Sequence, residues 1–200
     1  VPEYRPQILT GISAGAINAA HLASYRGSWP DSVEALRALW LDLDTEKVFR
    51  TKLRDLLRNM LSAALPLVSG GRIGRGSVRG MVDTQPLRLF LESALPLEEG
   101  GLPGVRENLA DGLLDSLAII TTNYETGRST AWFESATRRD LGRGQLRVEV
   151  GRVGLDHVMA SSATPILFPP QRVGDGFYGD GALRQLQPIS PGRKFGATRL

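Results

Sequence analysis

The chain has 200 residues, of which 42% are hydrophobic and 22% charged, and its formal net charge is +3. That length and apolar content suffice for one α/β core, so we expect a single domain over residues 1–200. The sequence holds no cysteine, which excludes disulfides and thiol chemistry. No stretch approaches the roughly 18 uninterrupted apolar residues that a membrane span needs.

Most of the 24 basic residues are arginine. Because a guanidinium forms bidentate contacts with phosphate, this composition favours contact with anionic headgroups at a membrane surface. A compositional bias of the source genome explains the same excess equally well. We predict no nucleic-acid partner, and the oligomeric state stays open.

The first motif is a G-x-S-x-G pentapeptide, Gly11-Ile12-Ser13-Ala14-Gly15. We expect an apolar strand over residues 7–10 and a helix that continues to about Tyr25. A strand, a sharp turn and a helix are what a nucleophile elbow requires. The small residues around Ser13 allow a tight turn and leave the amide of Ala14 where an oxyanion would form. Ser13 is therefore the candidate nucleophile, and a glycine-rich loop with an incidental serine is the alternative.

The middle of the chain shows helical patterns. We expect a helix from a cap at residues 30–32 to Leu41. A second helix, over about residues 45–65, carries leucines on one face and basic residues elsewhere. Such a helix can roof an acyl site or lie on a membrane surface, or it can simply pack on the core. Residues 69–80 indicate a glycine-rich loop, and residues 83–86 start a further helix.

Two strands are expected over residues 117–122 and 129–133, joined by a turn at residues 125–127. Both are runs of apolar and β-branched residues, which are typical of buried strands. Helices alternate with these strands along the chain. That alternation indicates an α/β layered fold.

A serine nucleophile needs a base, which is most often a histidine oriented by a carboxylate. The sequence has two histidines. His21 lies eight positions beyond Ser13 on the helix that begins at the elbow, so it points away from the helix start. His157 comes late in the chain, as the usual order of hydrolase triads requires, but it lies in a helical stretch. We interpret both as structural or surface residues and keep a triad through His157 as an alternative.

The other candidate base is Asp180, which lies between Gly179 and Gly181 after an aromatic pair. With such small neighbours, its side chain can approach another loop closely. An aspartate is ionised at neutral pH and can therefore accept a proton. The alternative is an ordinary Asp-Gly turn between strands. Asp175-Gly176 is the better example of such a turn, and we expect a hairpin there.

The elbow and Asp180 together resemble a known family. The pentapeptide at residues 11–15 and the triplet Asp180-Gly181-Ala182 are similar to the Ser-Asp dyad motifs of the patatin-like phospholipases. The A-S-S-A-T-P run at residues 160–165, with F-P-P at residues 168–170, resembles the segment before the catalytic aspartate in bacterial members. The similarity begins at about Gln7 and is strongest at the two ends. It implies a layered hydrolase fold whose central, mostly parallel sheet is flanked by helices.

The resemblance also implies roles for single residues. Matched position by position, Ser13 is the nucleophile, Asp180 the base and Ala14 the backbone donor of the oxyanion hole. The remaining motif positions are Gly11, Gly15, Gly181 and Ala182.

One departure from the family pattern concerns the glycine-rich oxyanion loop, a G-G-G-x-[RK]-G run that precedes the elbow. Here ten residues stand before Gly11, and Gly70-Gly71-Arg72 follows the elbow, so it cannot substitute. We therefore expect a chain that lacks the family's first strand and this loop and belongs to a longer protein. Alone it should be much less active, because losing one oxyanion donor lowers the rate about a hundredfold to a thousandfold.

The resemblance implies a lipid acyl hydrolase of the phospholipase A, lysophospholipase or carboxylesterase type. Asp180 would take the proton of Ser13, and an acyl-enzyme would form and then be hydrolysed. No cofactor or metal is expected, because no His, Asp or Glu cluster has ligand spacing. The alternatives are a Ser-His-Asp esterase and a non-catalytic lipid-binding or scaffold domain.

The expected partners are a lipid or ester substrate and a membrane surface contacted peripherally. We expect a cytoplasmic or membrane-peripheral location, and secretion stays open because the sequence before Val1 is not known.

Overall fold

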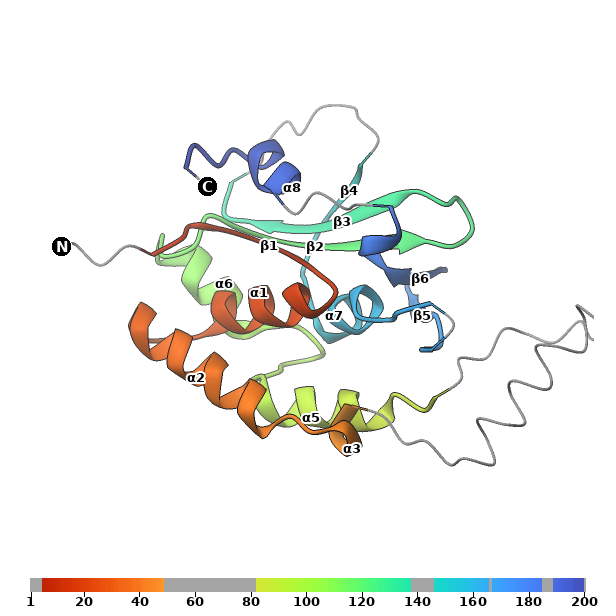
Figure 1. The fold of residues 1–200 in the computed structure, drawn as a ribbon. Coiled ribbons are helices and arrows are strands. Elements are labelled where there is room, and N and C mark those ends of the chain that lie inside the picture. The colour runs from red at the N-terminus through yellow and green to blue at the C-terminus, as the bar shows by residue number, and fades with distance from the viewer. Residues whose placement is uncertain (1–4, 49–81, 138–145, 166, 185–188, 200) are drawn as a thin grey trace, which may run out of the picture.

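The computed structural model describes residues 5–48, 82–137, 146–165, 167–184 and 189–199. The helix expected over residues 45–65 is described only at its start, and the loop expected over residues 69–80 lies outside the described residues. The described elements form a sheet with helices on both faces (Figure 1).

The sheet and the helices are made of short elements. The strands are β1 (Ile8–Ile12), β2 (Ser116–Asn123), β3 (Ser129–Ser135), β4 (Arg147–Val150), β5 (Gln171–Val173) and β6 (Gly176–Asp180). The helices are α1 (Ala14–Ser24), α2 (Trp29–Asp42), α3 (Thr45–Val48), α5 (Gln85–Ala94), α6 (Pro103–Ala110), α7 (Leu155–Ser161), α8 (Ile189–Lys194) and the 3-10 turn η1 (Gly181–Leu183).

The strand at the centre of the sheet is β2. It pairs with β3 along one edge, while β1 and β6 share its other edge. The pairs β1–β2 and β3–β4 are parallel, and the other three described pairs are antiparallel. The expected α/β layered fold is confirmed, but the expectation of a mostly parallel sheet is wrong. The reason is that β2–β3 and β5–β6 are hairpins, whose tight turns force antiparallel pairing.

The core lies on both faces of β2, which is buried along its whole length. Successive side chains of a strand point to opposite faces. Leu117 and Ile119 therefore pack in the cluster that includes α1, α5, α6 and α7, and Ile120 packs in the smaller cluster on the other face. There Phe195, directly after α8, stacks on Phe133 with ring centroids 4.7 Å apart. Figure 1 shows the same division: α8 lies above the sheet, and α1, α2, α5, α6 and α7 lie below it.

Two expected boundaries differ from those in the structure. Ser28 caps α2, since its Oγ accepts a hydrogen bond from the amide of Asp31 at 3.2 Å. The helix thus begins before Pro30, which fits its first turn because no amide is needed there. The hairpin turn between β5 and β6 consists of Gly174 and Asp175, one residue earlier than expected, and Gly174 has a φ of 57°.

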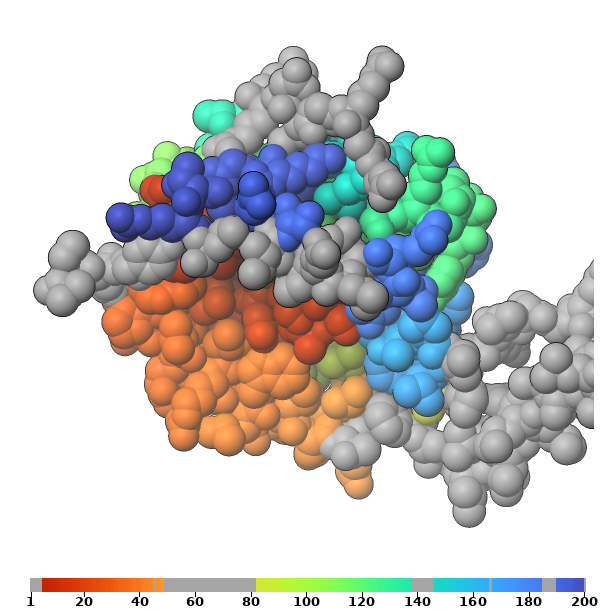
Figure 2. Space-filling model, turned by 45° about the horizontal axis from the view of Figure 1, so that its top comes forward, coloured from red at the N-terminus to blue at the C-terminus, as the bar shows by residue number. Residues whose placement is uncertain are grey.

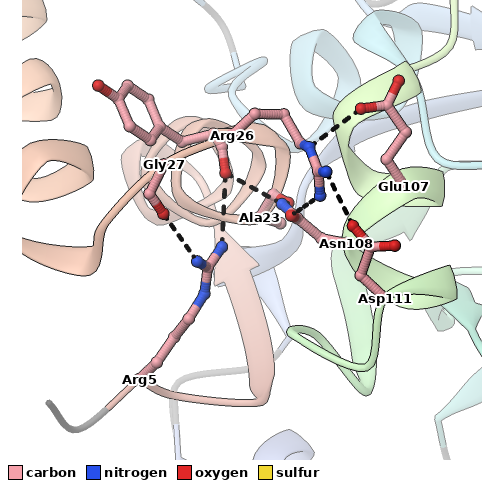
Figure 3. A network of polar contacts seen from close by, with 8 residues as sticks. Arg5, Ala23, Arg26, Gly27, Glu107, Asn108 and Asp111 are labelled. Atoms are coloured by element: carbon pink, nitrogen blue, oxygen red, sulfur yellow. Dashed lines mark hydrogen bonds and ion pairs between the residues drawn. The ribbon is translucent and has the colours of Figure 1, made fainter.

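The far end of α1 is fixed by a polar network (Figure 3). The buried Asn108 of α6 donates to the carbonyls of Ala23 at 2.8 Å and of Tyr25 at 3.0 Å. Its Oδ1 accepts from Arg26, which also forms ion pairs with two carboxylates of this region. Arg5, before β1, donates to the carbonyl of Gly27 at 3.0 Å. The network therefore ties β1, α1 and α6 together and holds the helix that begins at the elbow.

Candidate active site

The register of the sheet brings the two ends of the candidate site together. β1 runs parallel to β2 and ends at Ile12, opposite Ile120, while β6 runs antiparallel and ends at Asp180, opposite Thr121. Both strands lie on the same edge of β2, so their carboxyl ends meet head-on. Ser13 follows β1 directly and therefore lies beside Asp180, 167 residues later in the chain. Figure 2 agrees, with red atoms of the β1–α1 segment adjoining blue atoms of the C-terminal part.

Ser13 stands in a strained backbone conformation. Its φ is 55° and its ψ is −130°, in the left-handed half of φ space that non-glycine residues rarely adopt. Such a conformation costs about 1–3 kcal/mol and persists only where the surroundings enforce it. A Cβ on Gly11 would lie 2.4 Å from the carbonyl oxygen of Gly15, so only glycine lets α1 approach the strand end. A Cβ on Gly15 would contact nothing within 4 Å.

The hydroxyl of Ser13 points at the carboxylate of Asp180. Ser13 Oγ donates to Asp180 Oδ2 at 2.8 Å. The other oxygen, Oδ1, accepts from the amide of Ala182 at 2.8 Å, and Thr164 Oγ1 lies 3.5 Å from Oδ2. Asp180 is only 5% exposed. The carboxylate is thus buried, fixed by a backbone donor on one oxygen and directed at Ser13 with the other.

The glycines beside Asp180 allow this close packing. A Cβ on Gly181 would lie 2.4 Å from the carbonyl oxygen of Ile120, and one on Gly179 would lie 2.0 Å from the hydroxyl of Tyr124. Burial, and then the negative charge of Asp180, raise the pKa of Tyr124. The phenol therefore stays neutral beside the carboxylate.

The first turn of α1 offers backbone donors next to Ser13. The carbonyl of Ser13 accepts from the amide of Ala16 at 2.8 Å, and the Ser13 side chain makes no cap hydrogen bond. The first amides of a helix have no acceptor within the helix. Ala14, which supplies the first of these amides, is exposed. A donor at this position can bind an oxyanion that forms above Ser13.

Two serines at the end of α7 contact the backbone of Ser13. Ser161 Oγ accepts from the amide of Ser13 at 3.0 Å, and Ser162 Oγ donates to the Ser13 carbonyl at 3.2 Å. Sequence reasoning missed both contacts. The only signal was the A-S-S-A-T-P run, because local patterns do not reveal the partners of small polar side chains.

The histidines have other contacts. His157 Nδ1 accepts from the amide of Gly154 at 2.9 Å, and the imidazole lies 4.5 Å from the Trp132 ring. Burial lowers the pKa of His157 and of His21. Within the described residues, no hydrogen bond joins Ser13 to either histidine. The structure thus brings together Ser13, Asp180 and Ala14. His157 instead accepts a hydrogen bond from the amide of Gly154 at the other end of α7.

The described residues contain neither a membrane-spanning helix nor a cluster of metal-binding side chains. None of the helices there combines the length and the apolar composition that crossing a bilayer requires. In the same part of the chain, no three His, Cys, Asp or Glu side chains are grouped so that they could hold a metal ion.

The comparison with known proteins agrees with the geometry. The family model for the patatin-like phospholipases matches residues 2–191. No curated protein and no solved structure matches the chain. The family match spans both the elbow and the strand end that carries Asp180. The chain therefore belongs to the patatin-like phospholipase family, a family of lipid acyl hydrolases.

Proposed function

We propose that the chain hydrolyses acyl esters of lipids through a Ser13–Asp180 dyad and an acyl-enzyme. The observation that carries the proposal is the 2.8 Å hydrogen bond from the Ser13 hydroxyl to the buried carboxylate of Asp180. A base must lie within about 2.6–3.2 Å of the proton that it removes, and this pair meets that requirement. A nucleophile paired directly with a base is the general signature of covalent catalysis.

The first half-reaction forms the acyl-enzyme. Ser13 Oγ attacks the carbonyl carbon of the ester while its proton passes to Asp180 Oδ2. The Ala14 amide donates to the oxyanion of the tetrahedral intermediate. When the intermediate collapses, the ester C–O bond breaks and the leaving alcohol takes the proton from Asp180. The acyl group is then bound to Ser13.

The second half-reaction is the reverse, with water in place of the alcohol. Asp180 takes a proton from water, whose oxygen attacks the acyl carbon, and then returns a proton to Ser13 Oγ. A fatty acid leaves and the dyad is restored. Because Ala182 occupies Oδ1, the same oxygen, Oδ2, serves both half-reactions.

The substrate class in this proposal is an ester with an acyl chain, presented by a membrane or a micelle. The family assignment supports a lipid ester. The exposed position of Ala14 at the start of α1 supports access from outside the core. Peripheral contact with a lipid surface is part of the proposal.

The test is hydrolysis by Ser13→Ala, Asp180→Asn and the double variant, made in the full-length protein. The assays use a short-chain aryl ester and phospholipid vesicles, with thermal unfolding as the control for folding. We expect each single variant to lose most turnover and the double variant to be scarcely worse, because residues acting as a unit are not additive. Turnover that survives Ser13→Ala would contradict the proposal and favour a binding or scaffold role.

A further inference from the structure

Side chains at the end of α7 form hydrogen bonds with both the amide and the carbonyl of Ser13. Ser161 contacts the amide of Ser13 and Ser162 contacts its carbonyl. Both serines are buried, with exposed fractions of 0% and 8%. The two hydroxyls therefore constrain the one described residue of the elbow that has a positive φ without being glycine.

The direction of each hydrogen bond at Ser161 is fixed. Its Oγ lies 2.6 Å from the carbonyl oxygen of Ile120, which can only accept, so the single hydroxyl proton is used there. The lone pairs of the same oxygen then face the amide of Ser13 at 3.0 Å. Ser161 thus connects the nucleophile to β2 at the position where β1 ends, since Ile120 is the partner of Ile12.

Ser162 acts on the other peptide group. Its hydroxyl donates to the carbonyl of Ser13 at 3.2 Å, and that carbonyl also accepts from the amide of Ala16 in the first turn of α1. The helix start and α7 therefore share one acceptor. Rotation of this peptide would break both bonds, so Ser162 opposes relaxation of the strained ψ.

The need for such a constraint follows from how the Ser13 side chain is used. A serine at the N-cap position ordinarily bonds to a backbone amide of the first turn and so fixes the helix entry. Here the side chain makes no such bond, and its hydroxyl is directed at Asp180, to which it donates. The backbone must therefore be held by other groups, and those of α7 are in place.

The helix that supplies the two serines is itself fixed at its other end. The amide of Leu155 donates to the carbonyl of Gly100 at 3.1 Å, and a Cβ on Gly154 would lie 2.2 Å from that oxygen. His157 caps the same end through the amide of Gly154. An element held in this way can impose a position on Ser13.

We propose that Ser161, assisted by Ser162, is a positioning residue that holds Ser13 in its strained conformation with the hydroxyl directed at Asp180. Ser161 also occupies the amide of Ser13, so an oxyanion would be bound by the amide of Ala14 rather than by that of Ser13. This inference rests on the proposed function, because it assigns a role to groups that support the same nucleophile.

The test compares Ser161→Ala with a matched control, Ser24→Ala, in the full-length protein. Ser24 is also a buried serine, and its hydroxyl donates to the carbonyl of His21 at the far end of α1. Three quantities are measured: the second-order rate of Ser13 labelling by a fluorophosphonate, kcat and KM on an aryl ester, and the midpoint of thermal unfolding. Labelling reports the reactivity of Ser13 without dependence on lipid binding.

We expect Ser161→Ala to lower the labelling rate and kcat by about ten- to hundredfold, which corresponds to about 1.4–2.7 kcal/mol, with KM nearly unchanged. Ser24→Ala should lower the unfolding midpoint and leave labelling within about twofold. Ser162→Ala, which removes a single longer hydrogen bond, should reduce labelling less than Ser161→Ala. It serves as the second variant if Ser161→Ala does not fold.

Three results separate the inferences. Labelling of Ser161→Ala and Ser162→Ala at the unmodified rate would overturn the positioning role and leave the dyad intact. An equal loss of labelling in Ser24→Ala would also overturn it, because the effect would then follow stability alone. Absence of Ser13-dependent labelling in the unmodified protein would instead overturn the proposed function.

Discussion

The two ends of α7 both carry buried polar groups, but only one end contacts Ser13, the proposed nucleophile. At the carboxyl end, Ser161 and Ser162 bond to Ser13, whose hydroxyl is directed at Asp180. At the amino end, His157 caps Gly154 and packs on the Trp132 ring. The residue type most often used as a base therefore lies at the end without the nucleophile. The difference teaches that the proposed base follows from the hydrogen-bond partner of Ser13 rather than from residue type.

The amino end also has features that usually attract a functional assignment. Glu134, which is 9% exposed, accepts from the amide of Val153 at 2.7 Å and lines a cavity of about 220 Å³ together with His157. Burial raises the pKa of Glu134, against the opposing effects of the hydrogen bond from Val153 and of the charges of Arg106 and Arg152. Shifted pKa values often mark active sites, but ordinary structural networks shift them as well. Here the observed bonds of both groups are to backbone amides near the start of α7.

The largest expected effect is the difference in kcat between variants of the two candidate bases, Asp180 and His157. Asp180→Asn keeps the side-chain shape but removes the proton acceptor, so kcat should fall by about 10²- to 10⁴-fold, the usual contribution of a general base. His157→Ala should leave kcat within about threefold and lower the free energy of unfolding by about 1 kcal/mol, because a cap and a ring contact are lost. Initial rates on an aryl ester and urea unfolding measure the two quantities. A large loss of activity in His157→Ala with activity retained in Asp180→Asn would reverse the comparison in favour of a triad.

A smaller effect is expected from the backbone that places Asp180. In Gly181→Ala the new methyl would meet the carbonyl of Ile120 at 2.4 Å, so η1 must move away from β2. We expect the free energy of unfolding to drop by about 1–3 kcal/mol, as for overpacking elsewhere, and kcat to drop with it.

The matched control for this change is Gly151→Ala, whose methyl would have nothing within 4 Å. It should be nearly neutral in both measurements. Equal behaviour of the two variants would show that the close approach of η1 to β2 does not position the carboxylate.

The smallest expected effect is the pH dependence of stability at the amino end of α7. The pKa of Glu134 is raised above the ordinary value of 4.5, so the folded protein keeps a proton that the unfolded chain has already lost. The folded state then binds more protons, and stability falls as pH rises from about 4.5 through the folded pKa. The side chain in Glu134→Gln cannot titrate but can still accept from the amide of Val153. The part of the pH-dependent loss of stability that comes from Glu134 should therefore disappear.

Urea unfolding at several pH values between about 4 and 8 measures the slope. Glu125→Gln, at an exposed residue in the β2–β3 turn, is the control and should keep the slope of the unmodified protein. An unchanged slope in Glu134→Gln would mean that the buried carboxyl does not contribute to the pH dependence.

The sequence alone predicted the strand, turn and helix of the elbow, because their pattern is local. An apolar strand, small residues around Ser13 and a helix follow one another within about twenty positions, and β1 and α1 form there. Asp180 was singled out as the candidate base through its glycine neighbours and the family resemblance. Its approach to Ser13 depends on β2, to which both β1 and β6 pair, and no local pattern reports that register.

Other elements escaped prediction for physical reasons. β4 lies at the edge of the sheet and has only four residues, so its Arg-Val-Glu-Val alternation is too short to identify a strand, and α8 has only six residues. The cap of α2 was placed too late because Asp31 and Ser28 are both good capping residues, and the structure uses Ser28. The contacts of Ser161 and Ser162 depend on the position of α7 against β2 and the start of α1, which is a tertiary property.

The most direct test of the central claim is to locate the acyl group during turnover. The full-length protein is mixed with a slowly hydrolysed acyl ester, quenched with acid and digested, and the peptides are measured by mass spectrometry. We predict an acyl adduct on the peptide that contains Ser13, formed at a normal rate in His157→Ala, strongly slowed in Asp180→Asn and absent in Ser13→Ala. An adduct on another residue, or full-rate acylation of Ser13 in Asp180→Asn, would contradict the dyad.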